Sequence, residues 1–255
     1  MPKPVAEPKP KINVRLILRV ALWMLVFAGV AVSAKEVQSF LETDARFRFE
    51  KLEIRGAVYT SRARIQSVFQ ADFNRSVFQL SLAERRRHVL AIDWVRTASL
   101  MRVWPNRIVV TVTERTPVAF AKLPIAGTMR HWLAVVDGEG ILLSIPPKSH
   151  FSLPVLSGIT EEQSDEERRL RVESMMHLLA DLGPEAKDVS EINAADAQDM
   201  RVIADVDGQA VELWLGDQRF RSRYRNFLSH YGDIRRREER ASIFDLRMDD
   251  RITTR

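Results

Sequence analysis

The chain has 255 residues, of which 45% are hydrophobic and 29% are charged, a balance typical of a globular protein with one or two domains. It contains no cysteine, which excludes disulfide bonds and cysteine-ligated metal sites. The net charge is +5, but residues 1–34 hold five basic residues and one acidic residue, so 34 basic and 33 acidic residues remain in the rest. A nucleic-acid-binding domain needs its basic excess on the folded part, so we expect no nucleic-acid partner.

One long stretch, residues 16–34, is apolar or small throughout apart from Arg19 and Ser33. A helix of this length spans about 28 Å, close to the ~30 Å hydrocarbon core of a bilayer. The basic residues that precede it predict a cytoplasmic tail over residues 1–15 and an exported body beyond the membrane. The alternative is a cleavable signal peptide ending at Ala34, which would export the body as well.

Residues 47–114 carry the pattern of a small α+β module. Alternating apolar residues predict the strands, and apolar residues spaced at i, i+3 and i+4 predict the helices. A Ser-x-x-Glu capping box starting at Ser81 marks the beginning of the second helix. The predicted elements are a strand over 47–54 with one slip in phase, a helix after 61, a helix over 82–91, and strands over 95–103 and 107–114. This β-α-α-β-β order predicts two helices on one face of a three-stranded sheet.

The second half of the chain predicts a mixed sheet with flanking helices. Short alternating strands are punctuated by Gly, Pro and Asp turns, and two longer segments have helical periodicity. The predicted strands are 118–121, 132–136, 141–145, 155–158, 189–193, 200–206, 211–215 and 242–247, with helices over 161–182 and 217–231. Residues 235–240 are expected to form a loop or a frayed turn, and residues 252–255 can extend the last strand.

The sequence offers no catalytic or metal-binding pattern. Its five histidines lack metal-ligand spacing, and no nucleophile elbow or phosphate-binding loop is present. The pair Gly138-x-Gly140 lacks the third glycine and the following helix of a dinucleotide-binding loop, so a hairpin turn explains it better. We therefore predict a protein that is not an enzyme and has no cofactor, metal or small-molecule substrate.

What remains is a scaffold with strand edges. An edge strand presents unpaired N–H and C=O groups, to which an extended segment of another protein can add as a further strand. The last predicted strand is a candidate for such an edge. The alternative is that this strand lies inside the sheet and only closes it.

Short motifs in a fixed order run through nearly the whole predicted body. They are Ile54-Arg55-Gly56, Trp94-Val95, Trp104-Pro105-Asn106, Val110-x-Val112-x-Glu114-Arg115-x-Pro117-Val118-Ala119, Val136-Asp137-x-Glu139-Gly140, Leu153-Pro154-Val155-Leu156-x-Gly158, Leu215-Gly216 and Phe244-Asp245-Leu246-Arg247. Together with the tail, the apolar segment and the two predicted folded parts, they resemble the FtsQ/DivIB family of cell-division proteins. The first module is similar to a POTRA domain, which several export and assembly proteins share.

The resemblance implies an α+β protein with five consecutive parts. These are a cytoplasmic tail (1–15), a transmembrane helix (16–34), a linker (35–46), a POTRA-like domain (47–116) and an FtsQ-type β domain (117–255). It further implies a non-catalytic, single-pass protein of the cell inner membrane at the division septum, with a cytoplasmic N-terminus and a periplasmic body. Such a protein binds FtsB- and FtsL-like membrane proteins and links early and late division proteins.

In that family, FtsB adds a strand beside the last strand of the sheet. Carried over by position, the partner-binding residues are Asp245, Leu246, Arg247, Met248, Asp249, Asp250, Arg251 and Ile252. An aromatic residue commonly follows the Asp-Leu-Arg triplet in the family, and here Met248 takes its place. Methionine is flexible enough to fill a similar groove.

A second hypothesis is a POTRA-containing factor of periplasmic export or outer-membrane assembly. Such proteins usually continue into repeated POTRA modules or a membrane barrel, whereas one module and one mixed domain are predicted here. Because members of the FtsQ/DivIB family stay attached to the membrane, the resemblance also favours an anchor over a cleaved signal peptide.

Overall fold

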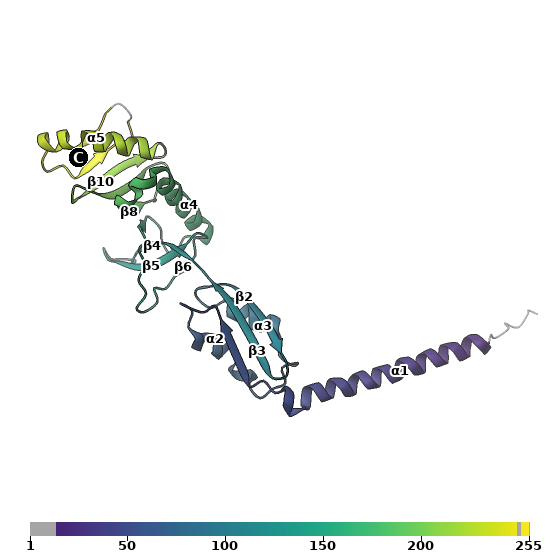
Figure 1. Cartoon of the computed structure of the whole chain (residues 1–255). Helices are drawn as coiled ribbons and strands as arrows, with labels where there is room; N and C mark the ends of the chain where they lie inside the picture. Colours follow the sequence, from purple (N-terminus) through teal and green to yellow (C-terminus); the bar gives the residue numbers. More distant parts are fainter. Residues whose placement is uncertain (1–13, 249–250, 255) are drawn as a thin grey trace, which may run out of the picture. The chain divides into compact units, whose positions relative to one another are not determined.

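The computed structural model of the protein describes residues 14–248 and 251–254 (Figure 1). The predicted tail lies outside the described residues up to residue 13. The chain divides into two compact units. Unit 1 holds the chain up to Ala57 with Ser61–Ile92 and Thr97–Val112, and unit 2 holds Val58–Thr60, Asp93–Arg96 and Thr113–Arg255.

Helix α1 (Val14–Thr43) contains the whole predicted apolar segment and continues through most of the predicted linker. Its stretch Leu22–Thr43 is long and apolar enough to cross a membrane, and none of that window is buried inside the protein. Large apolar side chains such as Trp23 and Phe27 are 73% and 77% exposed. A helix that exposes apolar side chains in this way is stable in lipid rather than in water, which fits a single-pass membrane protein.

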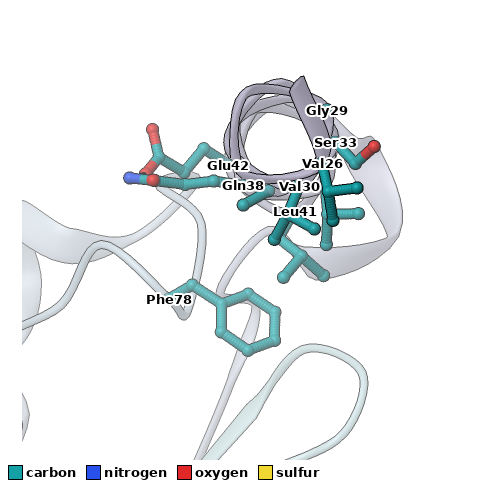
Figure 2. A pocket seen from close by; sticks show the side chains of 10 residues that line it. Val26, Gly29, Val30, Ser33, Gln38, Leu41, Glu42 and Phe78 are labelled. Atoms are coloured by element: carbon teal, nitrogen blue, oxygen red, sulfur yellow. The ribbon is translucent and has the colours of Figure 1, made fainter. Parts of the chain in front are cut away.

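The C-terminal end of α1 is joined to the rest of unit 1. The hydroxyl of Ser76 donates a hydrogen bond to the carbonyl oxygen of Leu41 (2.7 Å). Beside this contact, α1 and the side chain of Phe78 border an open groove of about 850 Å³ (Figure 2).

The three-stranded sheet of the first module has the order β1-β3-β2, and β1 runs parallel to β3. The elements after α1 are η1 (Ala45–Phe47), β1 (Lys51–Arg55), α2 (Arg62–Val68), η2 (Gln70–Asp72), α3 (Leu82–Leu90), β2 (Val95–Val103) and β3 (Arg107–Glu114). The predicted order β-α-α-β-β is confirmed. The predicted capping residue of α3 is confirmed too, since the Ser81 hydroxyl accepts a hydrogen bond from the N–H of Glu84 (3.3 Å).

The first strand is shorter than the sequence pattern predicts. Phe47 ends the 3₁₀ turn η1, and β1 begins only at Lys51. The backbone at Phe47 and Phe49 pairs instead with the loop before α3: Val77 N–H donates to the oxygen of Phe47 (2.9 Å), and Phe49 N–H donates to the oxygen of Arg75 (2.8 Å). Both phenylalanines are buried, so the alternation of apolar residues reflects burial outside the sheet.

Unit 2 is built on a nine-stranded mixed sheet with the order β12-β11-β10-β9-β8-β7-β4-β5-β6. Its strands are β4 (Pro117–Pro124), β5 (His131–Asp137), β6 (Leu142–Leu143), β7 (Val155–Ser157), β8 (Val189–Asn193), β9 (Met200–Val206), β10 (Gln209–Gly216), β11 (Ile243–Asp245) and β12 (Thr253–Thr254). The predicted hairpin turn at Gly138 and Gly140 is confirmed, because it joins the antiparallel strands β5 and β6.

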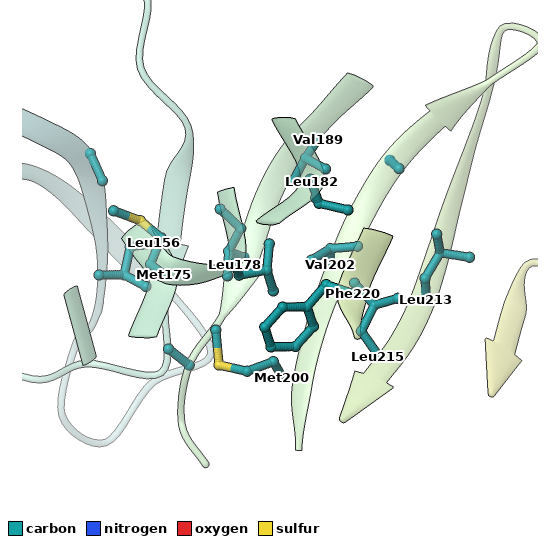
Figure 3. Close-up of a cluster of buried hydrophobic side chains, with 14 of the residues drawn as sticks. Leu156, Met175, Leu178, Leu182, Val189, Met200, Val202, Leu213, Leu215 and Phe220 are labelled. Atoms are coloured by element: carbon teal, nitrogen blue, oxygen red, sulfur yellow. The ribbon is translucent and has the colours of Figure 1, made fainter. Parts of the chain in front are cut away.

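Helices α4 (Asp165–Leu182) and α5 (Phe220–Arg237) pack on this sheet through one continuous core, with η3 (Gly183–Asp188) between α4 and β8. Figure 3 shows Leu178 of α4 and Phe220 of α5 near Val202 and Leu213 of the sheet. The four side chains are at most 2% exposed. Burial of this size is the main favourable term in folding.

The bounds of α4 and α5 differ from the prediction, and α5 begins at Phe220 rather than at residue 217. α4 begins at Asp165 rather than at residue 161, because Ser164 and Glu167 form a reciprocal capping box. α5 continues to Arg237, so the first part of the predicted 235–240 loop is helical. Cations in the last turn of a helix are favoured by its dipole, and this turn holds three arginines.

Two short segments from within the first module belong to unit 2. The carboxylate of Glu114 accepts hydrogen bonds from the backbone N–H groups of Val58 (3.0 Å), Tyr59 (2.9 Å) and Thr60 (2.5 Å). The indole N–H of Trp94 donates to the carbonyl oxygen of Ser144 (2.8 Å), and its ring packs on Val135 and Leu143. These contacts extend unit 2 back into residues 58–60 and 93–96.

Candidate functional site

The C-terminal strands form one end of the nine-stranded sheet. β11 runs parallel to β10, with Phe244 opposite Leu213 and Asp245 opposite Trp214. The Glu212 N–H donates to the oxygen of Ser242 (2.8 Å), and the Leu246 N–H donates to the oxygen of Trp214 (2.9 Å).

The chain then reverses, which the sequence did not predict. β11 ends at Asp245, and β12 returns antiparallel to it, with Thr253 opposite Asp245 and Thr254 opposite Phe244. Residues 252–255 therefore do not extend the last predicted strand. The Asp245 carboxylate accepts a hydrogen bond from the N–H of Arg247 (3.2 Å), a local bond that bends the chain as in an Asx turn.

β12 is consequently the end strand of the sheet among the described residues, and β6 is the end strand on the other side. β12 is only two residues long and follows directly after Arg251 and Ile252. One side of β12 pairs with β11. Short end strands limit unwanted pairing with other chains, but they still present a backbone to which a strand can add.

Two buried side chains hold β11 in place. Phe244 is fully buried, and its ring centroid lies 4.9 Å from that of Phe227 and 6.0 Å from that of Tyr231 on α5. Leu246 is 2% exposed and belongs to the same core. The side chain of Leu246 is thus a structural contact within the chain, and its backbone N–H is already paired with Trp214.

A stack of cationic and aromatic groups lies on β9, β10 and the second residue after β11. The guanidinium carbon of Arg201 is 4.0 Å from the ring centroid of Trp214, and that of Arg247 is 5.0 Å from it. Arg247 also pairs with Asp245 (2.5 Å) and Asp199 (3.3 Å). The hydrogen bond that Arg247 donates to the Asp245 carboxylate raises the pKa of Arg247 above its usual value.

Met248 is the exposed apolar residue of the predicted site, with 53% of its surface accessible. The Nε of Arg251 lies 3.0 Å from its sulfur. Ile252 is partly buried against the main core. Leu246, Met248 and Ile252 border a hollow of about 280 Å³ beside the start of α5.

The structure thus brings together six of the eight predicted partner-binding residues, and Asp249 and Asp250 lie outside the described residues. Sequence reasoning missed Arg201 and Trp214, which stand directly opposite each other in the β9–β10 hairpin. A two-residue turn at Asp207-Gly208 sets which residues of β9 and β10 face each other, so the pairing of Arg201 with Trp214 could have been predicted from the position of the turn.

No group of three or more histidine, cysteine, aspartate or glutamate side chains in the described part of the chain is arranged to hold a metal ion. Asp199 and Asp245, the carboxylates described beside the candidate edge, pair with Arg247 instead.

Comparisons with known proteins agree with this architecture. Residues 47–115 match the domain family described as "POTRA domain, FtsQ-type". A protein of Koribacter versatilis named "Cell division protein FtsQ" is 32% identical over 98% of this chain and 72% of its own length. The chain belongs to the FtsQ family of cell-division proteins.

Other relatives with the same name support this assignment. The FtsQ protein of Novosphingobium aromaticivorans is 29% identical over 96% of this chain and 74% of its own length. That of Nitrosospira multiformis is 24% identical over 92% of this chain and 94% of its own length. The similarity therefore includes unit 2 as well as the first module.

Proposed function

We propose that this member of the FtsQ family is a non-catalytic scaffold of the division machinery that binds FtsB- and FtsL-like membrane proteins at the septum. In this proposal α1 crosses the cell inner membrane once, with residues 1–15 in the cytoplasm and the body in the periplasm. The scaffold links early and late division proteins. The parts are those predicted from the sequence, with 47–116 as the POTRA domain and 117–255 as the β domain.

The observation that carries the proposal is the position of β12 at the end of the nine-stranded sheet. Because β12 pairs with β11 at Phe244 and Asp245, a partner strand is proposed to add beside β12 rather than beside β11. The exposed side chain of Met248 next to this edge supplies an apolar contact, and the Arg247 cation supplies a charged one. Main-chain hydrogen bonds then provide affinity and side-chain contacts provide specificity.

Tethering supports this assignment energetically. A two-residue strand offers few hydrogen bonds, so the edge alone would bind weakly. If both proteins are anchored in the same membrane, the effective concentration of the partner segment rises, and a weak edge is then sufficient.

The edge is tested by placing a charge on Met248 in the purified full chain. Met248→Glu is expected to weaken binding of a periplasmic FtsB-like segment at least tenfold, about 1.4 kcal/mol, because a carboxylate must be desolvated at the contact. Met129→Glu is the matched control, since Met129 is 95% exposed on the turn between β4 and β5. Unchanged affinity in Met248→Glu, or equal loss in both variants, contradicts the edge assignment.

The anchor is tested on the native protein. Mass spectrometry of the protein from its own host is expected to find a chain that still contains α1. A mature N-terminus at Lys35 would identify residues 1–34 as a cleaved signal peptide and would contradict the single-pass proposal.

A further inference from the structure

We infer that an aromatic cluster at the end of α1 is a membrane-contact surface that sits in the headgroup region of the bilayer. The cluster consists of Phe40, Phe47, Phe78 and Trp104, and is named the interfacial cluster here. The inference rests on the membrane span proposed for α1, and it is independent of the partner edge at β12.

The interfacial cluster joins three parts of unit 1 that are distant in sequence. The ring of Phe47 lies at its centre, with ring centroids at 6.0 Å (Phe40), 5.4 Å (Phe78) and 5.8 Å (Trp104). Phe78 and Trp104 also contact each other edge to face at 5.4 Å. These are the preferred geometries of aromatic pairs, so the cluster is a packed unit rather than a chance grouping.

Only part of this cluster is covered by the protein. Phe47 is 8% exposed, but Phe40 is 48% exposed and Trp104 is 66% exposed. Large aromatic side chains left open to water cost free energy, and an exposed apolar patch of this kind marks an interaction surface.

The position of the interfacial cluster on α1 indicates that lipid covers it. Phe40 lies six residues after Ala34, the end of the predicted apolar segment, so its Cα is about 9 Å further along the helix axis. The headgroup region on each side of a bilayer is about 5–8 Å thick. The Cα of Phe40 therefore lies just past the outer limit of that region, and its side chain, which in a helix points back towards the N-terminus, reaches into the region.

The open groove beside α1 runs from the interfacial cluster to the part of α1 that is proposed to lie in the hydrocarbon core of the bilayer. Phe78 faces α1 across this groove, and the α1 residues that line it reach from Glu42 back to Val26 (Figure 2). The groove is lined mainly by apolar residues, with Ser33, Gln38 and Glu42 as its polar members, and a mainly apolar surface beside a lipid-exposed helix face is best covered by lipid. Tryptophan, which has an apolar ring and a polar N–H, is enriched at this level of membrane proteins.

Charged groups around the cluster fit the same assignment. The guanidinium of Arg46 lies 5.4 Å from the ring centroid of Phe40 and pairs with Asp44 (3.0 Å). Arg48 follows on the exposed surface two residues later. Arginines at this height can contact lipid phosphates while the aromatic rings enter the interface.

The experiment uses the full chain in vesicles of phosphatidylethanolamine and phosphatidylglycerol. Because the chain has no cysteine, single cysteines can carry an environment-sensitive fluorophore. Gln79→Cys reports on the cluster, since Gln79 is exposed and follows Phe78. Gln66→Cys, on the exposed surface of α2, is the matched control, and Val30→Cys reports on the span.

Nitroxide-labelled lipids then measure the depth of each fluorophore. Headgroup-labelled lipid is expected to quench the Gln79 probe at least three times more than the Gln66 probe, and acyl-labelled lipid is expected to quench the Val30 probe. Adding Trp104→Glu should reduce quenching at Gln79 at least twofold and leave Val30 unchanged.

Three results would overturn the inference, and they can be told apart. Equal quenching at Gln79 and Gln66, with Val30 quenched, leaves the membrane span intact and rejects the lipid contact. An unquenched Val30 probe rejects the span and the inference together. Signals at Gln79 that grow with the protein-to-lipid ratio identify a second copy of this chain as the occupant in place of lipid.

Discussion

Replacing Phe244 with alanine tests the packing that holds the candidate edge. Phe244 is the fully buried residue of β11, and its ring contacts Phe227 and Tyr231 on α5. Removing a buried phenylalanine ring typically costs about 3–5 kcal/mol, because apolar burial is lost and a cavity remains. Phe244→Ala is therefore expected to destabilise unit 2 by that amount.

The expected shift in melting temperature follows from the size of the unit. Unit 2 has roughly 150 residues. For a unit of that size each kcal/mol lowers the midpoint by about 2–4 °C, so the loss should be roughly 6–20 °C. Thermal unfolding of the full chain in detergent, followed by near-ultraviolet circular dichroism, measures it. Amide hydrogen exchange should also accelerate at β11 and β12, because β12 pairs with β11.

Two further variants control the interpretation. Phe244→Leu keeps most of the apolar volume and should cost less than Phe244→Ala. Leu170→Ala, on the exposed surface of α4, should change stability by less than about 0.5 kcal/mol. A Phe244→Ala midpoint within the range of Leu170→Ala would refute the reasoning that this ring anchors the edge.

Two other predictions concern the carboxylate of Glu114 and the backbone conformation of Gly56. Burial raises the pKa of Glu114, but hydrogen bonds from residues 58–60 outweigh it and hold this pKa below its usual value. The ionised carboxylate of Glu114 therefore stabilises the fold above about pH 4.5, and this stabilisation is lost as the pH falls through the folded pKa. Since protonated glutamic acid resembles glutamine, the difference in free energy of unfolding between wild type and Glu114→Gln should become smaller on acidification. Gly56→Ala should destabilise unit 1 by roughly 1–3 kcal/mol, because Gly56 has φ +80° and an added Cβ would lie 2.1 Å from the oxygen of Val112.

Both predictions have clear contradicting outcomes. Chemical denaturation at pH 7 and at pH 3.5 checks the first, and a gap that stays constant or widens at low pH would show that Glu114 is not held ionised by its N–H donors. For the second, Gly127→Ala is the matched control, since Gly127 has φ +73° but nothing lies within 4 Å of an added Cβ. Equal losses in the two variants would exclude the close approach as the cause.

Local patterns in the sequence were sufficient for most of the elements. The apolar stripe of Phe220, Tyr224, Phe227, Leu228 and Tyr231 predicts a helix, and all of these residues are buried in α5 except Leu228, which is 37% exposed. The alternating residues of β9 and β10 likewise predict a hairpin, because alternation and a Gly turn are both local signals. Helix ends were less predictable, since a capping box such as that at Ser164 competes with other possible starts.

Long-range pairing was the part that local patterns could not supply. Phe47 and Phe49 alternate like a strand, yet their backbone pairs with a loop almost 30 residues away. Nothing near residue 245 indicates that β11 runs parallel to β10, because that pairing depends on the length and packing of α5 between them. Before the reversal into β12, the Asp245 carboxylate accepts a hydrogen bond from the N–H of Arg247, a feature that strand propensity does not contain.

The sequence therefore indicated that the last predicted strand lies near one end of the sheet, but not which strand ends it, and the partner-binding role of this region stays a prediction. In the Phe244-Asp245-Leu246-Arg247 motif, Phe244 and Leu246 are core residues and Asp245 and Arg247 lie nearer the surface, as simple alternation predicts. The end strand could be identified only from the three-dimensional structure, because β12 pairs with the side of β11 that the sequence suggested as an edge.

The most direct test of the central proposal is photocrosslinking from the end of the sheet in growing cells. A photoreactive amino acid replaces Met248 or Thr253 in the full chain, and Met129 serves as the control position. The proposal predicts a covalent adduct with an FtsB-like membrane protein from Met248 and Thr253, and none from Met129. The absence of an adduct from both edge positions, or adducts of equal yield from all three, would contradict strand addition at β12.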